Sequence, residues 1–254
     1  MIDLHSHVLP GVDDGARTAG QGADVLRAMA VRGVTDLCLT PHLLAEQAAR
    51  GAPAKHDRAF GELSAVAPEM PRLYRGAEVM LDRPLADEVG ERRDVTIAGS
   101  RYILVEFTRL VTFETVARAL ARVVEVGLVP ILAHPERYSP CSPAAVRRWR
   151  EGGAVMQVDA GTLAAHSQRG DRARQLVSEG LADILAGDNH GDDRSVAQGV
   201  EVLREHGGET QAELLGTVNP RAILEDGDLE PVPALALKDS WLRRLRRLLD
   251  GEAG

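Results

Sequence analysis

The sequence predicts an α/β protein built from parallel strand–helix units, and three observations lead to that prediction. The chain has 254 residues, a length typical of one α/β barrel. Seven short runs rich in Val, Ile and Leu recur along it, bounded by polar residues or glycine, as expected for buried parallel strands. Longer amphipathic stretches separate these runs, as expected for helices. The alternation indicates either a barrel or a doubly wound sheet.

The elements can be assigned in chain order. The predicted strands span residues 2–4, 36–40, 73–79, 102–107, 129–133, 155–158 and 184–186. The predicted helices span residues 19–32, 113–126, 169–179 and 195–205. In the first helix, Val25, Leu26 and Met29 recur at helical spacing. Gly180 and Gly207 follow the last two helices, and glycine commonly ends a helix.

We expect residues 1–230 to form one barrel domain and residues 231–254 to form a linker and a C-terminal helix. Pro231 and Pro233 lie in a linker-like stretch, residues 228–237. Residues 238–249 place Trp241 and several leucines beside four arginines, which is typical of a basic amphipathic helix. Two interpretations remain open for this helix: docking on the barrel through its leucine face, or contact with a membrane surface or an acidic partner.

Composition and charge narrow the class of protein. The formal charge of −8 argues against a nucleic-acid binder, which usually has a basic surplus. Two cysteines, Cys38 and Cys141, cannot form a disulfide framework, so a reduced, cytoplasmic setting is expected. The N-terminal residues do not show the pattern of a signal peptide, and no apolar run is long enough to span a membrane.

Metal-ligating residue types gather at the ends of the predicted strands. His5 and His7 end the first strand, and residues two apart on a strand face the same way, so both imidazoles can bind one cation. The same residue types end or follow later strands: His42, Glu78, Glu106, His134, Asp188 and His190. In a parallel barrel this end of the strands forms the active-site face, and buried carboxylates there would be costly without a counter-cation. A mixed set of imidazoles and carboxylates of this size suits two or three ions, with manganese favoured over iron or zinc.

The other histidines and one aspartate are weaker candidates. His56 and His206 fall in polar, helix-like segments and are predicted to be surface residues. His166, in the loop after the sixth strand, is a candidate for substrate contact. Asp159 ends the sixth strand and is a candidate for supporting the site without binding metal.

Several motifs resemble those of the PHP (polymerase and histidinol phosphatase) superfamily of metal-dependent phosphoesterases. Within it, they look most like the bacterial capsular-polysaccharide tyrosine phosphatases of the CpsB/YwqE type. Across about residues 1–225 the matching motifs are DLHSHVLPGVDDGART, TPH, GAEV, YILVEF, PILAHPERY, GDNH and TVNPRAIL. The resemblance implies a distorted seven-stranded, TIM-like (β/α)7 barrel with a centre of three metal ions.

Carried over position by position, the resemblance implies nine metal ligands: His5, His7, Asp14, His42, Glu78, Glu106, His134, Asp188 and His190. The choice between Asp14 and its neighbour Asp13 stays open. Asn189 stands where this group commonly has alanine, and its side chain is expected to point away from the metals. Arg137 and Arg194 match arginines that the group uses around the phosphate, which a planar guanidinium recognises well.

The resemblance implies a protein-tyrosine phosphatase of capsule or exopolysaccharide synthesis, acting on the tail of a bacterial tyrosine kinase through attack of a metal-activated hydroxide. That tail would lie near the inner membrane face, where the basic C-terminal helix could make a peripheral contact. Two alternatives remain: a phosphoesterase acting on a small metabolite, such as histidinol phosphate or a nucleotide, and a non-catalytic, metal-containing interaction module. A cysteine phosphatase is disfavoured, because the C-x5-R stretch from Cys141 to Arg147 lacks phosphate-wrapping glycines.

Overall fold

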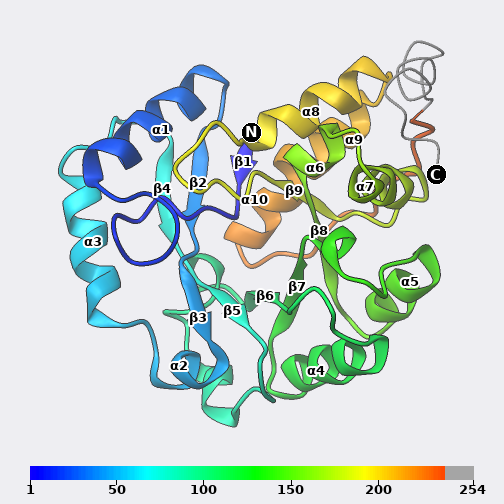
Figure 1. Cartoon of the computed structure of the whole chain (residues 1–254), viewed down its shortest axis with the longest axis horizontal. Helices are drawn as coiled ribbons and strands as arrows, with labels where there is room; N and C mark the ends of the chain where they lie inside the picture. Colours follow the sequence, from blue (N-terminus) through cyan, green and yellow to red (C-terminus); the bar gives the residue numbers. More distant parts are fainter. Residues whose placement is uncertain (238–254) are drawn as a thin grey trace.

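The structure, a computed structural model, describes residues 1–237 and contains two parallel sheets (Figure 1). The first sheet consists of β1 (Ile2–Asp3), β2 (Asp36–Leu39) and β4 (Arg72–Arg75). The second sheet consists of β3 (His42–Leu44), β5 (Glu78–Met80), β6 (Tyr102–Glu106), β7 (Val129–Ala133), β8 (Val155–Asp159) and β9 (Ile184–Ala186). The predicted helix within residues 238–249 lies outside the described residues.

The two sheets are parts of one distorted barrel. Strands β2 and β3 follow each other with only Thr40 and Pro41 between them, and β4 and β5 are separated only by Gly76 and Ala77. Hydrogen bonds continue across this break, from Gly76 N to Leu39 O (3.0 Å) and from Glu78 N to Pro41 O (3.2 Å). Each pair therefore acts as one interrupted strand, giving the seven strand positions that the sequence predicts.

Residues just beyond β1 and β9 close the ring. The Asp188 amide donates to His5 O (3.1 Å), and the His7 amide donates to Asn189 O (2.7 Å). A parallel bridge between Ser6 and Asn189 lies between these bonds. Together with the ladders inside each sheet, these contacts confirm the distorted seven-stranded barrel.

Helices surround the strands, and the four predicted ones are present (Figure 1). They are α1 (Ala19–Val31), α4 (Phe113–Glu125), α7 (Gln168–Ser178) and α8 (Val196–Glu205). Their first turns are capped by the Thr18, Thr112, Ser167 and Ser195 side chains, which accept hydrogen bonds from backbone amides.

Further helices in residues 1–237 lie outside the four predicted ranges, and most of them span only five to nine residues, too short for a clear periodic pattern. They are α2 (Ala45–Arg50), α3 (Ala54–Ser64), α5 (Pro143–Glu151), α6 (Ala160–Ala164), α9 (Glu209–Glu213) and α10 (Asn219–Leu224). Short 3-10 turns at Asp87–Glu91, Ile97–Gly99 and Pro135–Arg137, and a π-helical turn at Leu214–Val218, complete the described elements.

The strands are buried on both faces, which explains their continuous apolar runs. In β6, Tyr102 and Leu104 belong to a small cluster with Ile2, whereas Ile103 and Val105 pack in the larger cluster shared with the helices. Because residues two apart share a face of a strand, the row of Tyr102 and Leu104 continues to Glu106 at the end of β6. The inner face of the barrel thereby ends in a carboxylate.

The prediction that His56 is a surface residue is wrong, because its side chain is only 2% exposed. His56 shares one face of α3 with Ala59 and Leu63 at helical spacing, and all three are buried. His206 is half-buried and its Nδ1 lies 2.7 Å from Val202 O, whereas His166 is exposed. Both cysteines are free and buried.

The first part of the predicted linker lies against the barrel. The Glu230 amide donates to Asn219 Oδ1 (2.8 Å), and Gln211 Nε2 donates to Pro233 O (3.1 Å). Val232 is buried in the main core cluster. Among residues 1–237, no helix has the length and apolar character required to cross a membrane.

Candidate metal centre

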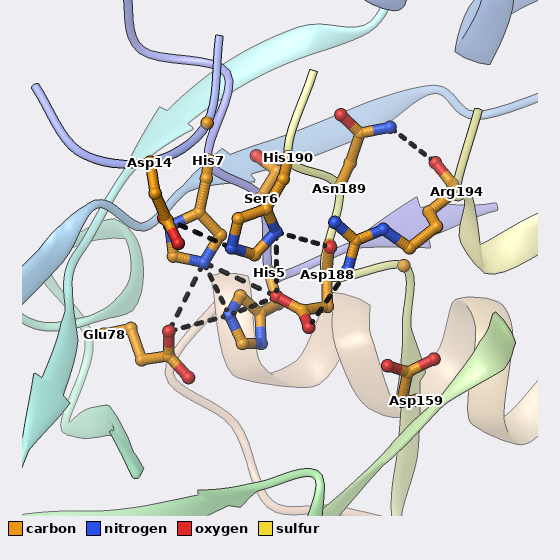
Figure 2. A network of polar contacts seen from close by, with 12 residues as sticks. His5, Ser6, His7, Asp14, Glu78, Asp159, Asp188, Asn189, His190 and Arg194 are labelled. Atoms are coloured by element: carbon orange, nitrogen blue, oxygen red, sulfur yellow. Dashed lines mark hydrogen bonds and ion pairs between the residues drawn. The ribbon is translucent and has the colours of Figure 1, made fainter. Parts of the chain in front are cut away.

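All nine predicted ligands converge at the carboxyl ends of the strands. Figure 2 shows six of them, His5, His7, Asp14, Glu78, Asp188 and His190. Their donor atoms form four groups, and within each group the atoms lie within 4.8 Å of one another. The groups are His7, Asp14, His42 and His190; His5, Glu78 and His134; His5, His7 and Asp188; and His42, Glu78 and Glu106. Because His5, His7, His42 and Glu78 each belong to two groups, the four groups form one continuous centre.

Glu78 lies in the middle of the centre and is 1% exposed. Its Oε2 lies 3.1 Å from His5 Nε2 and 3.3 Å from His7 Nε2, and its Oε1 lies 3.2 Å from His134 Nε2. Burial opposes ionisation of Glu78, but the positive charge of His5 and hydrogen bonds from neighbouring imidazoles outweigh it and hold the pKa of Glu78 well below its usual range. The central carboxylate is therefore ionised.

Asp188 and His134 reach the centre from unusual backbone conformations. Their φ angles are 49° and 37°, in the left-handed region that non-glycine residues seldom adopt. Such conformations are typical of functional sites, where surrounding contacts maintain them. Asp188 Oδ1 lies 3.3 Å from His5 Nε2 and 3.5 Å from His7 Nε2. Burial would raise the pKa of Asp188, but His5, His7 and Arg137 lower it overall.

The geometry favours Asp14 over Asp13 as the ligand. Asp14 Oδ1 lies 3.4 Å from His42 Nε2 and 3.3 Å from His190 Nε2, at the open side of the centre. The carboxylate of Asp13 instead contacts His7 Nδ1 (2.9 Å) and accepts hydrogen bonds from the amides of Gly15 (3.1 Å) and His42 (3.2 Å). Asp13 therefore fixes the orientation of His7, whose Nε2 faces the other donors.

Two further residues orient imidazoles, and the sequence analysis missed both. The side-chain amide of Gln157 lies within 3.1 Å of His5 Nδ1, so the opposite nitrogen of His5 faces the centre. Tyr138 Oη lies 3.5 Å from His134 Nδ1 and donates to Ala133 O (2.9 Å). Contacts of this kind fix the ring and tautomer of a metal-binding histidine. The sequence does contain a signal for Gln157. A side-chain amide in a buried strand almost always has a hydrogen-bond partner, so a buried glutamine indicates a polar contact inside the barrel.

The residues present fit divalent cations. His42 Nδ1 and Glu78 Oε2 lie 3.1 Å apart, yet neither buried atom makes a well-directed hydrogen bond. Burial opposes protonation of His42, but the nearby carboxylates of Glu106 and Glu78 raise its pKa to about 10. The carboxylates thus attract positive charge strongly enough to hold a proton on an imidazole. Imidazole nitrogens and carboxylate oxygens together suit manganese, iron or zinc.

Arg137 and Arg194 both reach the outer oxygen of Asp188. Arg137 Nη2 contacts Asp188 Oδ2 (2.5 Å) and Asp159 Oδ2, and Arg194 Nη1 lies 3.5 Å from Asp188 Oδ2. Asp159 also caps α6 by accepting from the Thr162 amide (2.8 Å), so it positions Arg137 rather than entering the centre. Two guanidinium groups therefore border the ligand cluster.

The side chain of Asn189 turns away from the ligand cluster, as expected (Figure 2). Its Nδ2 donates to Arg194 O (2.6 Å) and Asp192 O (3.0 Å). Asn189 therefore holds the loop that carries Arg194. A cavity of about 270 Å³ opens onto the centre and is lined by ligands from five strand ends together with Arg137.

Solved structures support the fold. The structure of YwqE from Bacillus subtilis and CpsB from Streptococcus pneumoniae, described as unique metal-dependent tyrosine phosphatases, matches with a TM-score of 0.74 and 22% identity over 94% of this chain and 100% of that one. The phosphotriesterase from Mycobacterium tuberculosis matches with a TM-score of 0.54 and 12% identity, over 83% of this chain and 86% of that one. At these identities the similarity shows a shared fold.

Curated relatives extend the similarity to the sequence. The tyrosine-protein phosphatase CpsB of Streptococcus pneumoniae is 24% identical over 241 residues, which is 89% of this chain and 99% of the relative. The tyrosine-protein phosphatase YwqE of Bacillus subtilis is 27% identical over 201 residues, 75% of this chain and 77% of the relative. The family model for capsular polysaccharide synthesis, CpsB/CapC, matches residues 1–225. This match spans the barrel and every predicted ligand, and the chain therefore belongs to the CpsB/CapC family.

Proposed function

We propose that this chain is a metal-dependent phosphomonoester hydrolase that acts on phosphotyrosine in proteins. The observation that carries the proposal is the convergence of nine candidate ligand side chains in one cluster, which Arg137 and Arg194 border and onto which a cavity opens. Relatives that share most of the chain are named tyrosine-protein phosphatases, which supports phosphotyrosine as the substrate.

The proposed ligands are His5, His7, Asp14, His42, Glu78, Glu106, His134, Asp188 and His190. They would hold two or three divalent ions; the mixture of imidazole and carboxylate suits manganese, iron or zinc, and manganese is the ion we propose. When bound, such ions supply positive charge for the phosphate oxygens and lower the pKa of water for attack on phosphorus.

The side chains of the chain supply orientation and charge for this reaction. Arg137 and Arg194, which border Asp188, would bind the oxygens of the phosphate and stabilise the negative charge that develops on them. Asp159 and Asp192 each contact one of these arginines and fix its position. In the net reaction the ester P–O bond breaks, a new P–O bond forms to the oxygen of water, and the tyrosine oxygen gains a proton. A phenol has a pKa near 10, which makes it a tolerable leaving group.

The proposed substrate is the phosphorylated tail of a bacterial tyrosine kinase that takes part in polysaccharide synthesis. The description of the family as one of capsular polysaccharide synthesis supports this assignment. We further propose that the basic segment of residues 238–249 places the enzyme at the inner face of the membrane. Deleting residues 238–254 should move the protein from the membrane to the soluble fraction of cells, and an unchanged distribution would contradict the membrane contact.

The function is tested by removing and restoring metal. After thorough chelation we expect hydrolysis of p-nitrophenyl phosphate to fall to background, and manganese, iron or zinc to restore it to different extents. His7→Asn should lower both the metal content and the turnover, whereas the control His206→Asn should change neither. Full activity of the metal-free protein would refute the proposal.

A substrate panel separates the alternatives. Phosphotyrosine peptides should have a higher kcat/KM than histidinol phosphate or nucleotides. The reverse order would favour a small metabolite as the substrate. Metal binding without hydrolysis of any phosphate ester would favour a non-catalytic interaction module.

A further inference from the structure

A second cavity adjoins the metal centre and differs from it in charge. It has a volume of about 490 Å³, and its charged lining residues are Arg109, Arg137, Arg169, Arg194 and Asp159. Arg109 and Arg137 line both cavities, so the two cavities lie side by side. Four guanidinium groups beside one carboxylate make this a positive region on a chain whose formal charge is −8.

The four arginines fall into two pairs with different surroundings. Arg137 and Arg194 are held by aspartates, as described above. Arg109 and Arg169 form no ion pair with any residue in the described range 1–237. Arg109 is exposed in the loop after β6, and Arg169 is half-buried in the first turn of α7. Their charges are therefore free to meet an anion that enters the cavity.

Arg109 and Arg169 lie where a substrate peptide bound through its phosphate could contact them. A phosphate bound by Arg137 and Arg194 would lie at the border between the two cavities, because these arginines line the second cavity and also contact Asp188 of the centre. A peptide carrying that phosphate on a tyrosine would extend its neighbouring residues over the second cavity. A small phosphate ester would not reach it.

We propose that Arg109 and Arg169 form a subsite for a second anionic group on the substrate chain, close to the phosphotyrosine. This proposal rests on the proposed function and names the substrate class more narrowly: an anionic phosphotyrosine peptide. The anion is either the carboxylate of a flanking acidic residue or a second phosphate, since a guanidinium pairs with both.

The test compares three peptides that carry the same central phosphotyrosine. One has aspartate and glutamate on both sides, one has asparagine and glutamine there, and one has the neutral flanks with a second phosphotyrosine nearby. For the manganese-loaded full chain we expect the kcat/KM of at least one anionic peptide to exceed that of the neutral peptide about fivefold, the order expected for one partly exposed ion pair. The preference should shrink at high salt, because salt screens exposed charges.

Substitutions test whether the preference for anionic peptides depends on Arg109 and Arg169. In Arg109→Gln with Arg169→Gln, the ratio of anionic to neutral peptide should approach one, and the loss on the anionic peptide should exceed any loss on p-nitrophenyl phosphate. Arg118→Gln is the matched control, because Arg118 is another exposed arginine, on α4, and has no ion pair within the described range. This control should keep the preference of the wild type.

The outcomes distinguish the subsite from the catalytic proposal. Equal kcat/KM for all three peptides, or a preference that survives both substitutions, would overturn the subsite. An advantage of the acidic peptide identifies carboxylates as ligands, and an advantage confined to the doubly phosphorylated peptide identifies phosphate. If no ester is hydrolysed, the proposed function fails; fluorescence anisotropy with the same labelled peptides still measures the binding ratio and tests the subsite without turnover.

Discussion

Asp13→Asn and Asp14→Asn should have different effects although the two residues are adjacent. Asp13 makes three contacts: with His7 Nδ1 at 2.9 Å and with the amides of Gly15 and His42 at 3.1 and 3.2 Å. An asparagine has one acceptor and one donor, so either orientation of its amide places N–H against N–H at one of these contacts. Losing a partner that orients a metal-binding histidine typically lowers metal affinity about 10- to 100-fold, or about 1.4–2.7 kcal/mol.

Within residues 1–237 the Asp14 carboxylate makes no comparable contact with the backbone, and its side chain is 69% exposed. We expect Asp14→Asn to leave the free energy of unfolding within about 0.5 kcal/mol of the wild type, as for most surface substitutions. It should instead remove a ligand and lower the number of tightly bound ions.

Calorimetric titration of the metal-free protein with manganese, together with elemental analysis, measures affinity and stoichiometry separately. Asp13→Asn should weaken binding at nearly full stoichiometry, and Asp14→Asn should reduce the stoichiometry. The opposite pattern would show that Asp13 is the ligand and that Asp14 is not.

Three further substitutions test other parts of the molecule. Cys141→Ser should keep kcat/KM within about twofold, because burial raises the pKa of this thiol to about 12 and leaves it protonated; an inactive variant would restore the cysteine mechanism. Arg137→Lys should lower kcat about 100-fold or more, because a lysine cannot present the planar fork to the phosphate; kcat near that of the wild type would remove Arg137 from the site. Asp36→Asn should cost about 2 kcal/mol of stability at pH 7, because it breaks the pair with Arg221 at the amino-terminal end of the barrel. Burial would raise the pKa of Asp36, but Arg221 and its other partners lower it overall, so this stabilisation is fully present above the unfolded pKa and is lost as the pH falls through the lower folded pKa. Urea unfolding should show a similar difference between wild type and variant at pH 7 and 5 and a smaller one at pH 3, and a constant difference would refute the assignment.

The fold could be predicted because buried parallel strands and amphipathic helices leave strong local patterns. The run at residues 102–107 is apolar on both faces, and β6 occupies Tyr102–Glu106. The predicted strand at 73–79 is divided into β4 and β5, because Gly76 and Ala77 interrupt the ladder between the two sheets. The closure of the barrel, which brings residues 5–7 against residues 188–189, joins segments far apart in the sequence, and no local pattern encodes it.

The ligand positions could be proposed for a related reason: parallel strands place their carboxyl ends at one edge. The residues that support them were harder to find. Gln157 orients His5, from which it is far in the sequence, and Asp13 orients His7 from the loop that follows it. Only the folded barrel brings each pair together. His56 was misjudged because a polar sequence conceals the buried face of α3. Arg109 and Arg169 have no sequence pattern in common, and only the cavity relates them.

The distribution of charge explains why an acidic chain suits an anionic substrate. Burial opposes protonation of His7, yet hydrogen bonds to Asp13 and Asp188 raise its pKa well above the usual range, so the acidic residues of the centre are already balanced locally by positive charge. Asp188 Oδ1 lies beside His5, whereas Asp188 Oδ2 contacts Arg137 and lies near Arg194. A divalent ion held by the candidate ligands would share the negative charge of Asp188 with the arginines, because positive groups compete for the same carboxylate. The charge of Arg137 and Arg194 would then be less fully neutralised by Asp188. A negative total and a positive region beside the cluster are therefore compatible, since the buried carboxylates of the cluster face histidines while Arg137 and Arg194 border it on the other side of Asp188.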